Sequence, residues 1–209
     1  MSAIYGSSDK KRFLELQKLN KGSRKIDHSM LFLADETYDI YKIHNQSDNF
    51  KFPRKKYNNY LGISESKSKE FEPEYLNPAI SDYWVVACCG NITNVDEIIE
   101  IDDSKAPNSI AQSFSIISSL NYAYSQSDDI DSVLISKSLE LLEGKFALWL
   151  HNCDNGNIFI AKNNCELYAD IYDNTFSSKP CEGLEPLNDG ELYQLTKEGI
   201  THVSFFDCL

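Results

Sequence analysis

The sequence has few basic residues for its length. It contains 20 Lys and Arg against 32 Asp and Glu in 209 residues, which gives a formal net charge of -12. A surface this acidic repels the phosphates of nucleic acids and of anionic membranes. We therefore expect no nucleic-acid partner, and we interpret the one basic cluster, KFPRKK at 51–56, as a solvated loop.

Long apolar runs are also absent. No window approaches the roughly 18 consecutive apolar residues that a membrane-spanning helix needs. The first residues, MSAIYGSSDKKR, place a short apolar piece before the charges, which is the reverse of a secretory signal peptide. These features predict a cytoplasmic protein without membrane contact.

The six cysteines form no CxxC pair and no regular disulfide framework. This pattern is typical of reduced, mostly buried thiols in a cytosolic chain. No two Cys or His residues have the short spacing of a zinc site, and the four histidines show no spacing that demands a catalytic triad. We expect neither a metal nor another cofactor.

The apolar content, 42% of 209 residues, supports one globular domain over residues 1–209 with a sizeable core. The chain begins with a strand pattern at 2–5 and a helical period at 13–20, closed by Gly22. Two apolar runs, 29–33 and 38–43, indicate a hairpin. A long polar segment follows at about 44–80, which we interpret as a loop region, and loops of this length are often functional or mobile.

The second half alternates between strands and helices. A buried strand is predicted at 83–87, and a helix is predicted to start at Asn94, with Glu97 completing a capping box. Apolar residues repeat at helical spacing over 110–120 and 130–142. The turn Asp154-Asn155-Gly156 predicts a β-hairpin between 146–150 and 158–161. Further strands are predicted at 166–171, 175–178, 191–195 and 201–205, and this order favours mixed layers over an open parallel sheet.

The stretch DYWVVACCGNITN, residues 82–94, ends an apolar run in two cysteines and a glycine. Cys88 and Cys89 are candidates for a redox pair, a nucleophile or a metal ligand. No histidine is adjacent to them, so the favoured interpretation is a buried thiol pair at the end of a strand. Trp84 and Trp149 lie inside strand patterns and are interpreted as core residues.

Four segments together resemble one family, the class II glutamine amidotransferases of the N-terminal-nucleophile hydrolases. They are MSAIYG at the start, CCGNITNVDEI at 88–98, LEGKFALWLHNCDNGNIFIAKN at 142–163, and TFSSKPCEGLEPLNDGELYQLTKEGI at 175–200. They occur in the family's order and at fitting distances. The resemblance implies an α/β (α+β) fold, a four-layer αββα sandwich built on two antiparallel sheets.

The resemblance also implies where an active site would lie. In the family, residue 2 becomes the chain start, and its α-amino group acts as the base for its own side-chain nucleophile. An Asn side chain and the following Gly N–H hold the oxyanion, and an Arg pairs with the substrate α-carboxylate. These roles fall on Ser2, on Cys89 with Gly90, and on Glu65. The Asp that binds the substrate amine would lie near 102–109, with Asp102 and Asp103 as candidates.

Three of these four side-chain roles are altered in this sequence. Ser2 has a hydroxyl in place of a thiol and is a nucleophile only once Met1 is removed. Cys89 is a weak donor in place of an amide, and Glu65 has the wrong charge for a carboxylate. We therefore expect a degenerate site without glutamine binding, in a structural, regulatory or interaction module.

Two alternatives remain open at this stage. The first is an active amidohydrolase or glutaminase that uses Ser2 as an N-terminal nucleophile. The second is a component of a larger assembly, for example a viral particle, in which the polar segment at 44–80 contacts a protein partner.

Overall fold

The computed structural model describes residues 2–21, 26–34, 37–43, 51–66, 77–101, 110–127, 129 and 131–208. Several residues that the sequence analysis singled out lie outside these ranges. These residues are Met1, Gly22, much of the polar segment at 44–80, and the candidates for the amine-binding Asp at 102–109.

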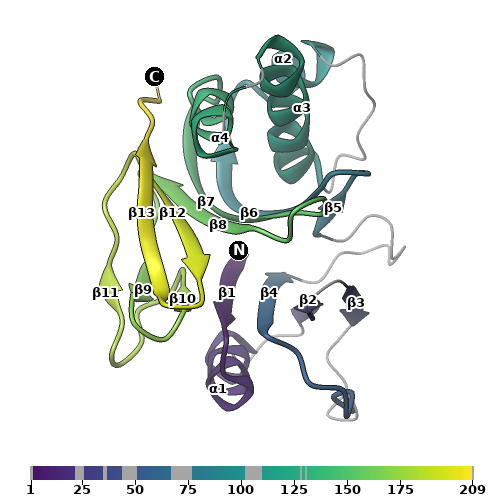
Figure 1. Ribbon diagram of the computed structural model, residues 1–209, viewed down its shortest axis with the longest axis vertical. Coiled ribbons are helices and arrows are strands. Elements are labelled where there is room, and N and C mark those ends of the chain that lie inside the picture. The colour runs from purple at the N-terminus through teal and green to yellow at the C-terminus, as the bar shows by residue number, and fades with distance from the viewer. Residues whose placement is uncertain are drawn as a thin grey trace.

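Thirteen strands form two antiparallel sheets in the described residues (Figure 1). The first, sheet A, has seven strands in the order β11-β9-β10-β1-β4-β2-β3. Its strands are β1 (Ala3–Ser7), β2 (Ile26–Leu33), β3 (Tyr38–Ile43), β4 (Asn59–Ser66), β9 (Tyr168–Asp170), β10 (Thr175–Ser177) and β11 (Glu185–Pro186).

The second sheet, sheet B, has six strands in the order β13-β12-β8-β7-β6-β5. Its strands are β5 (Ala79–Ile80), β6 (Trp84–Ile92), β7 (Gly144–Asn152), β8 (Ile158–Asn163), β12 (Glu191–Thr196) and β13 (Gly199–Phe205). The β7–β8 hairpin forms around Asp154, Asn155 and Gly156 as predicted, with Gly156 at φ 76°.

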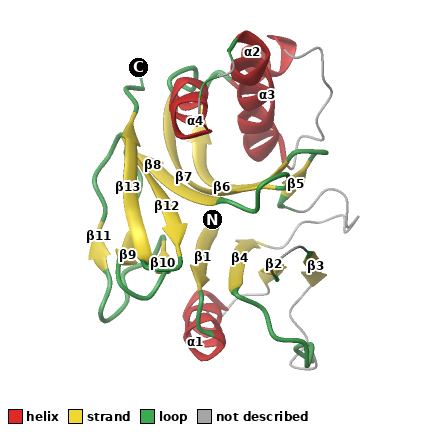
Figure 2. Cartoon of the chain, viewed as in Figure 1, coloured by secondary structure: helices red, strands yellow, loops and turns green. Residues whose placement is uncertain are grey.

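Helices cover the outer faces of both sheets, as Figures 1 and 2 show. Helix α1 (Lys10–Lys21) lies against sheet A, and α3 (Ala111–Gln126) and α4 (Asp131–Leu139) lie against sheet B. Helix α2 (Val95–Ile101) packs on α3. The predicted four-layer αββα sandwich of two antiparallel sheets is therefore confirmed.

Side chains that alternate along β6 enter two different cores. Trp84, Val86 and Cys88 pack among the helices on one face. Val85 and Cys89 face the other sheet. Cys88 is 4% exposed and Cys89 is 7% exposed, and both are free thiols, so the interpretation as buried thiols is confirmed. Their predicted place at the end of a strand is wrong, because β6 continues to Ile92. Because alternate residues of a strand point to opposite faces, these two thiols lie in different environments.

Trp149 on β7 lies at the centre of the core between the two sheets. Its side chain is fully buried, and its indole N–H donates a hydrogen bond of 3.1 Å to the carbonyl of Gly62 on β4. This bond joins sheet B to sheet A. The assignment of both tryptophans to the core is confirmed, since Trp84 is 2% exposed.

Strand β4 corrects the prediction of a continuous loop at 44–80. Leu61 and Ile63 are fully buried, and β4 lies between β1 and β2 in the middle of sheet A. The predicted capping box at Asn94 and Glu97 is a second correction. The Asn94 side chain instead donates to the Leu141 carbonyl and accepts from the Glu143 N–H, which ties the start of α2 to the chain after α4.

Leu19 is a third correction. It belongs to the apolar stripe predicted for α1, yet its side chain is 47% exposed.

Within the described part of the chain, no helix has the length and apolar character needed to cross a membrane.

Candidate functional site

Strands β1 and β4 bring Ser2 and Glu65 side by side. Ile4 of β1 pairs with Ile63 of β4, and both side chains pack in the core between the sheets. In an antiparallel pair, two residues back along one strand lie opposite two residues forward along the other. Ser2 and Glu65 are therefore cross-strand neighbours that point to the same inner face.

Ser2 also shares a cavity with Cys89 and Gly90. The cavity has a volume of about 330 Å³ and is lined by these three residues together with Cys165, Glu166 and Ser178. Four residues predicted from the family pattern thus meet at one end of the two sheets. Ser2, Cys89 and Gly90 line the cavity itself, and Glu65 lies beside Ser2.

The Cys89 thiol is held in a buried, neutral state. Burial raises its pKa to about 11, although contacts with the Ser178 hydroxyl and the backbone of Ile4 oppose this change. The Ile4 N–H donates a 3.0 Å hydrogen bond to the Ser178 hydroxyl, which fixes Ser178 at the start of β1. A neutral thiol is a weak hydrogen-bond donor, so Cys89 is a poor substitute for an amide that holds an oxyanion.

We expect Cys88 and Cys89 to resist alkylation in the folded protein. Burial also raises the pKa of Cys88. At pH 8 a thiol with a pKa near 11 is about 0.1% thiolate, against roughly a quarter for an ordinary cysteine. Mass spectrometry after iodoacetamide treatment should show both residues reacting at least about 100-fold more slowly than in urea-unfolded protein. A ratio below about 10 for Cys89 would contradict this environment.

Gly90 occupies a backbone conformation that side chains rarely adopt. Its φ is 133°, and a Cβ at this position would lie 2.1 Å from the carbonyl oxygen of Lys145 on β7. On the other edge of β6, the N–H groups of Cys88 and Ile92 donate to Ser113 and Gln112 of α3. Strand alternation directs the Gly90 N–H to that same edge, away from β7.

A buried polar chain holds the Glu65 carboxylate. The Asn77 side chain donates a 2.7 Å hydrogen bond to Glu65 and accepts one of 2.5 Å from the Ser113 hydroxyl. Burial raises the pKa of Glu65, and the negative charge of Asp27 adds to this, while the bonds from Asn77 and the charge of Lys42 oppose it. Asp27 is the register partner of Glu65 on β2 and is 2% exposed.

Only one member of the acidic pair formed by Glu65 and Asp27 was predicted from the sequence. Glu65 was expected from the family pattern, whereas Asp27 becomes its neighbour only through the pairing of β2 with β4. Whether ionised or protonated, neither carboxyl supplies the positive charge that would hold a substrate carboxylate. The inner face beside Ser2 therefore disfavours anions.

We expect Glu65→Gln to stabilise the protein at neutral pH. A raised pKa means that the folded state binds the Glu65 proton more tightly, so its contribution to stability falls as the pH rises through the folded pKa. Glutamine removes the buried charge and can still accept the bond from Asn77. Thermal melts should show a Tm increase of about 2–4 °C at pH 7 for each 1 kcal/mol gained, shrinking toward pH 5.

Glu185→Gln on β11 is the matched control, because Glu185 is exposed. It should change Tm by less than about 1 °C. A Glu65→Gln variant that is less stable than the parent at pH 7, or a difference that does not vary with pH, would contradict the electrostatic role of Glu65.

Three residues of the cavity were not predicted from the sequence, namely Cys165, Glu166 and Ser178. Ser178 lies in the segment at 175–200 that carries part of the family resemblance, so a closer reading of that segment could have found it. Cys165 and Glu166 follow β8 and carry no local signal. Among the described residues, no group of three His, Cys, Asp or Glu side chains is arranged to hold a metal ion.

Comparison with solved structures identifies the architecture. Glutamine phosphoribosylpyrophosphate amidotransferase from B. subtilis, complexed with ADP and GMP, superposes with a TM-score of 0.72 at 14% identity, over 97% of this chain and 49% of that one. A second match is described as the allosteric regulatory enzyme of purine biosynthesis, with a TM-score of 0.70 at 14% identity, over 97% of this chain and 48% of that one. The fold is that of a class II glutamine amidotransferase.

The chain spans about half the length of these two enzymes. A class II glutamine aminotransferase domain protein from Silicibacter pomeroyi matches over its full length, with 99% of this chain covered, a TM-score of 0.58 and 9% identity. No protein-family model and no curated protein sequence matches the chain. The class II amidotransferase fold is thus evident from the structure and not from overall sequence similarity.

Proposed function

We propose that this protein keeps the class II amidotransferase fold without glutaminase activity and acts as a structural, regulatory or interaction module. The observation that carries this proposal is the acidic face beside Ser2. Where the family pattern has an Arg, this chain has Glu65, next to the buried Asp27. Like charges about 4 Å apart repel by roughly 1 kcal/mol in water and about 4 kcal/mol near a protein surface, so the substrate carboxylate is repelled where it should be held.

The oxyanion position supports the same conclusion. Cys89 offers a buried neutral thiol where the family pattern has an amide N–H. Removing one oxyanion donor typically lowers the rate by about 10²–10³. Together with a hydroxyl nucleophile at Ser2 and the loss of the Arg, this change alters three of the four side-chain roles, while Gly90 is kept. A domain of this kind acts through its surface, on a protein partner in a larger assembly.

Calorimetric titration with glutamine tests this proposal. We expect no saturable binding up to about 10 mM glutamine, because the α-carboxylate is repelled. A dissociation constant above about 10 mM corresponds to a binding free energy of less than about 3 kcal/mol. Glutamine whose α-carboxylate is converted to a carboxamide is the matched control ligand, since it lacks the repelled charge. A dissociation constant for glutamine below about 1 mM, weakened by blocking the Ser2 cavity with Ser178→Phe, would overturn the proposal.

A second candidate function is an amidohydrolase for a cationic substrate. Ser2 and Gly90 line the same cavity, and the neighbouring carboxylates of Glu65 and Asp27 suit a positively charged ligand. This activity requires a free α-amino group on Ser2 to act as its base. Intact-mass measurement followed by hydrolysis of cationic amides, with Ser2→Ala as the control, distinguishes it from the first proposal.

A further inference from the structure

The hydrogen bonds that lead from sheet B to Glu65, beside Ser2, all point in one direction. The N–H of Cys88 on β6 donates a bond of 3.0 Å to the hydroxyl of Ser113 in the first turn of α3. The Ser113 hydroxyl donates one of 2.5 Å to the side-chain oxygen of Asn77. The Asn77 NH₂ group then donates one of 2.7 Å to Glu65 on β4. Glu65 is therefore the last acceptor of a chain in which every bond donates toward it.

The direction of this chain is fixed at Ser113. A serine hydroxyl has a single hydrogen to donate, and here the Asn77 oxygen accepts it. If the Asn77 amide were rotated by half a turn, Ser113 would lose this acceptor and the Asn77 oxygen would face an oxygen of Glu65. The side chains of Ser113 and Asn77 are 0% and 4% exposed, so a lost partner is not readily replaced by water. Ser113 thus determines which end of the Asn77 amide faces residue 65.

Asn77 presents only donors to residue 65. Burial raises the pKa of Glu65, whereas hydrogen bonds from both the side chain and the backbone of Asn77 lower it. A backbone N–H cannot become an acceptor. An Arg at position 65, as in the family pattern, would turn its own N–H donors toward those of Asn77. The surroundings of residue 65 therefore suit a carboxyl group and not a cation.

We propose that Asn77 and Ser113 are positioning residues that select a hydrogen-bond acceptor at position 65 and so keep an acidic group beside Ser2. This role rests on the proposed function, in which the acidic face beside Ser2 keeps a substrate carboxylate out. It goes beyond that function, because it makes the charge at Glu65 depend on two buried residues from the helix side of sheet B. Neither of them needs to touch a ligand.

Removal of the Asn77 donor should change the titration of Glu65. Asn77→Leu has a similar size and lacks the side-chain donor to the charged carboxylate. In a ¹³C NMR titration of the Glu65 carboxyl in the full chain, this variant should lower the acid dissociation constant by at least about 10-fold. Asp27 on β2 raises the pKa of Glu65 and Lys42 on β3 lowers it, and both stay in place in the variant.

The selection by Ser113 is tested by a double-mutant cycle. Glu65→Lys places donors opposite the Asn77 NH₂ group. In the Ser113→Ala background, the Asn77 amide can rotate and accept a bond from the lysine. Urea denaturation should therefore show that Glu65→Lys raises the unfolding equilibrium constant at least about 5-fold less in that background than in the parent. This cycle also serves if Asn77→Leu fails to fold.

Ser119→Ala is the matched control for both measurements. Ser119 is also a buried serine of α3, but its hydroxyl donates to the carbonyl of Ile116 within the same helix. It should change neither the titration of Glu65 nor the effect of Glu65→Lys.

An unchanged Glu65 titration in Asn77→Leu would overturn the proposal. So would a Glu65→Lys effect that is as large in Ser113→Ala as in Ser119→Ala. Neither measurement involves glutamine, so these results would leave the proposed absence of glutaminase activity intact. Glutamine turnover by the parent protein would overturn that function and leave the positioning of Glu65 unaffected.

Discussion

Gly90→Ala is expected to destabilise the protein by more than about 4 kcal/mol or to prevent it from folding. The added Cβ would lie 2.1 Å from the carbonyl oxygen of Lys145 and 2.8 Å from the Cα of Phe146. Both atoms belong to the backbone of β7, which pairs with β6 along its whole length and cannot move without breaking sheet B. The φ of 133° adds strain, because an L side chain rarely adopts it.

Gly156→Ala is the matched control for this prediction. Gly156 also has a positive φ, 76°, but a Cβ there would meet no atom within 4 Å. The cost should be only about 1–2 kcal/mol, the penalty for a left-handed alanine. Urea denaturation of both variants measures the difference. Similar losses in the two variants would contradict the close approach of Gly90 to β7.

Trp149→Ala is expected to cost about 3–5 kcal/mol. The indole is fully buried between the sheets, so its removal leaves a large cavity in the core that joins them. It also removes the 3.1 Å hydrogen bond to Gly62, which leaves a buried carbonyl without its indole donor. The loss should appear in the midpoint of urea denaturation.

Trp149→Phe separates these two effects. Phenylalanine fills most of the space but cannot donate to Gly62, so we expect a loss of about 1–3 kcal/mol. The two variants should therefore differ clearly in their midpoints. A Trp149→Ala loss below about 1 kcal/mol would show that the two sheets do not pack through this residue.

Local patterns predicted most of the elements in the second half of the chain. The β7–β8 hairpin follows from alternating apolar residues around Asp154-Asn155-Gly156, whose turn chemistry specifies the reversal. Helix α3 follows from the spacing of its apolar residues, and Ile117 and Leu120 are buried as that spacing requires. These features are local, so the sequence alone contains them.

Strand β4 could not be predicted in the same way. Its sequence, NYLGISES, has two aliphatic side chains and is flanked by polar residues. It becomes a central strand because β1 and β2 pair with its two edges, and both partners are distant in sequence. The meeting of Glu65 with Asp27 depends on this same pairing. Local composition carries no information about such long-range register.

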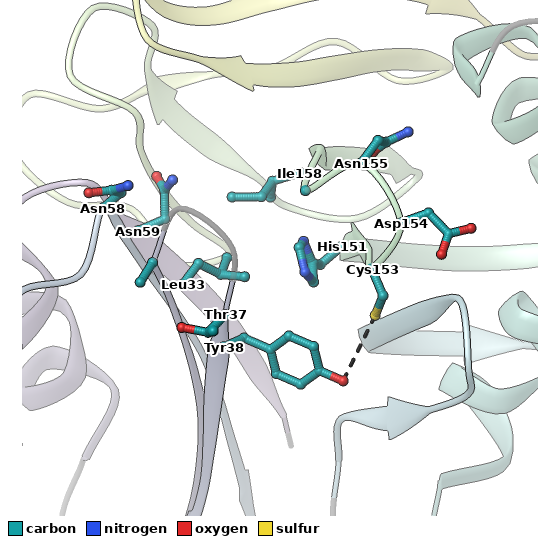
Figure 3. Close-up of a pocket in the computed structure, with 12 residues that line it drawn as sticks. Leu33, Thr37, Tyr38, Asn58, Asn59, His151, Cys153, Asp154, Asn155 and Ile158 are labelled. Atoms are coloured by element: carbon teal, nitrogen blue, oxygen red, sulfur yellow. Dashed lines mark hydrogen bonds between the residues drawn. The ribbon is translucent and has the colours of Figure 1, made fainter.

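The candidate site was predicted through a family pattern and not through local chemistry. The resemblance directed attention to Ser2, Glu65, Cys89 and Gly90, and strand register places all four at one end of the sheets. A second cavity, lined by Leu33, Tyr38, Asn59 and His151 among others (Figure 3), had no such pattern. His151 and Asn59 come from different sheets, and their meeting depends on how the two sheets pack.

The proposed absence of glutaminase activity is tested most directly by measuring turnover on protein whose Ser2 is the chain start, as verified by intact mass. The rate of glutamate formation is measured over glutamine concentrations that span a roughly 10-fold range. It should equal the rate of the Ser2→Ala variant and stay below about 10⁻³ s⁻¹, whereas a median enzyme turns over at about 10 s⁻¹. Restoring the amide with Cys89→Asn should not raise this rate, because Glu65 and Asp27 remain. Saturable glutamate formation that disappears in Ser2→Ala would contradict the proposed loss of catalysis.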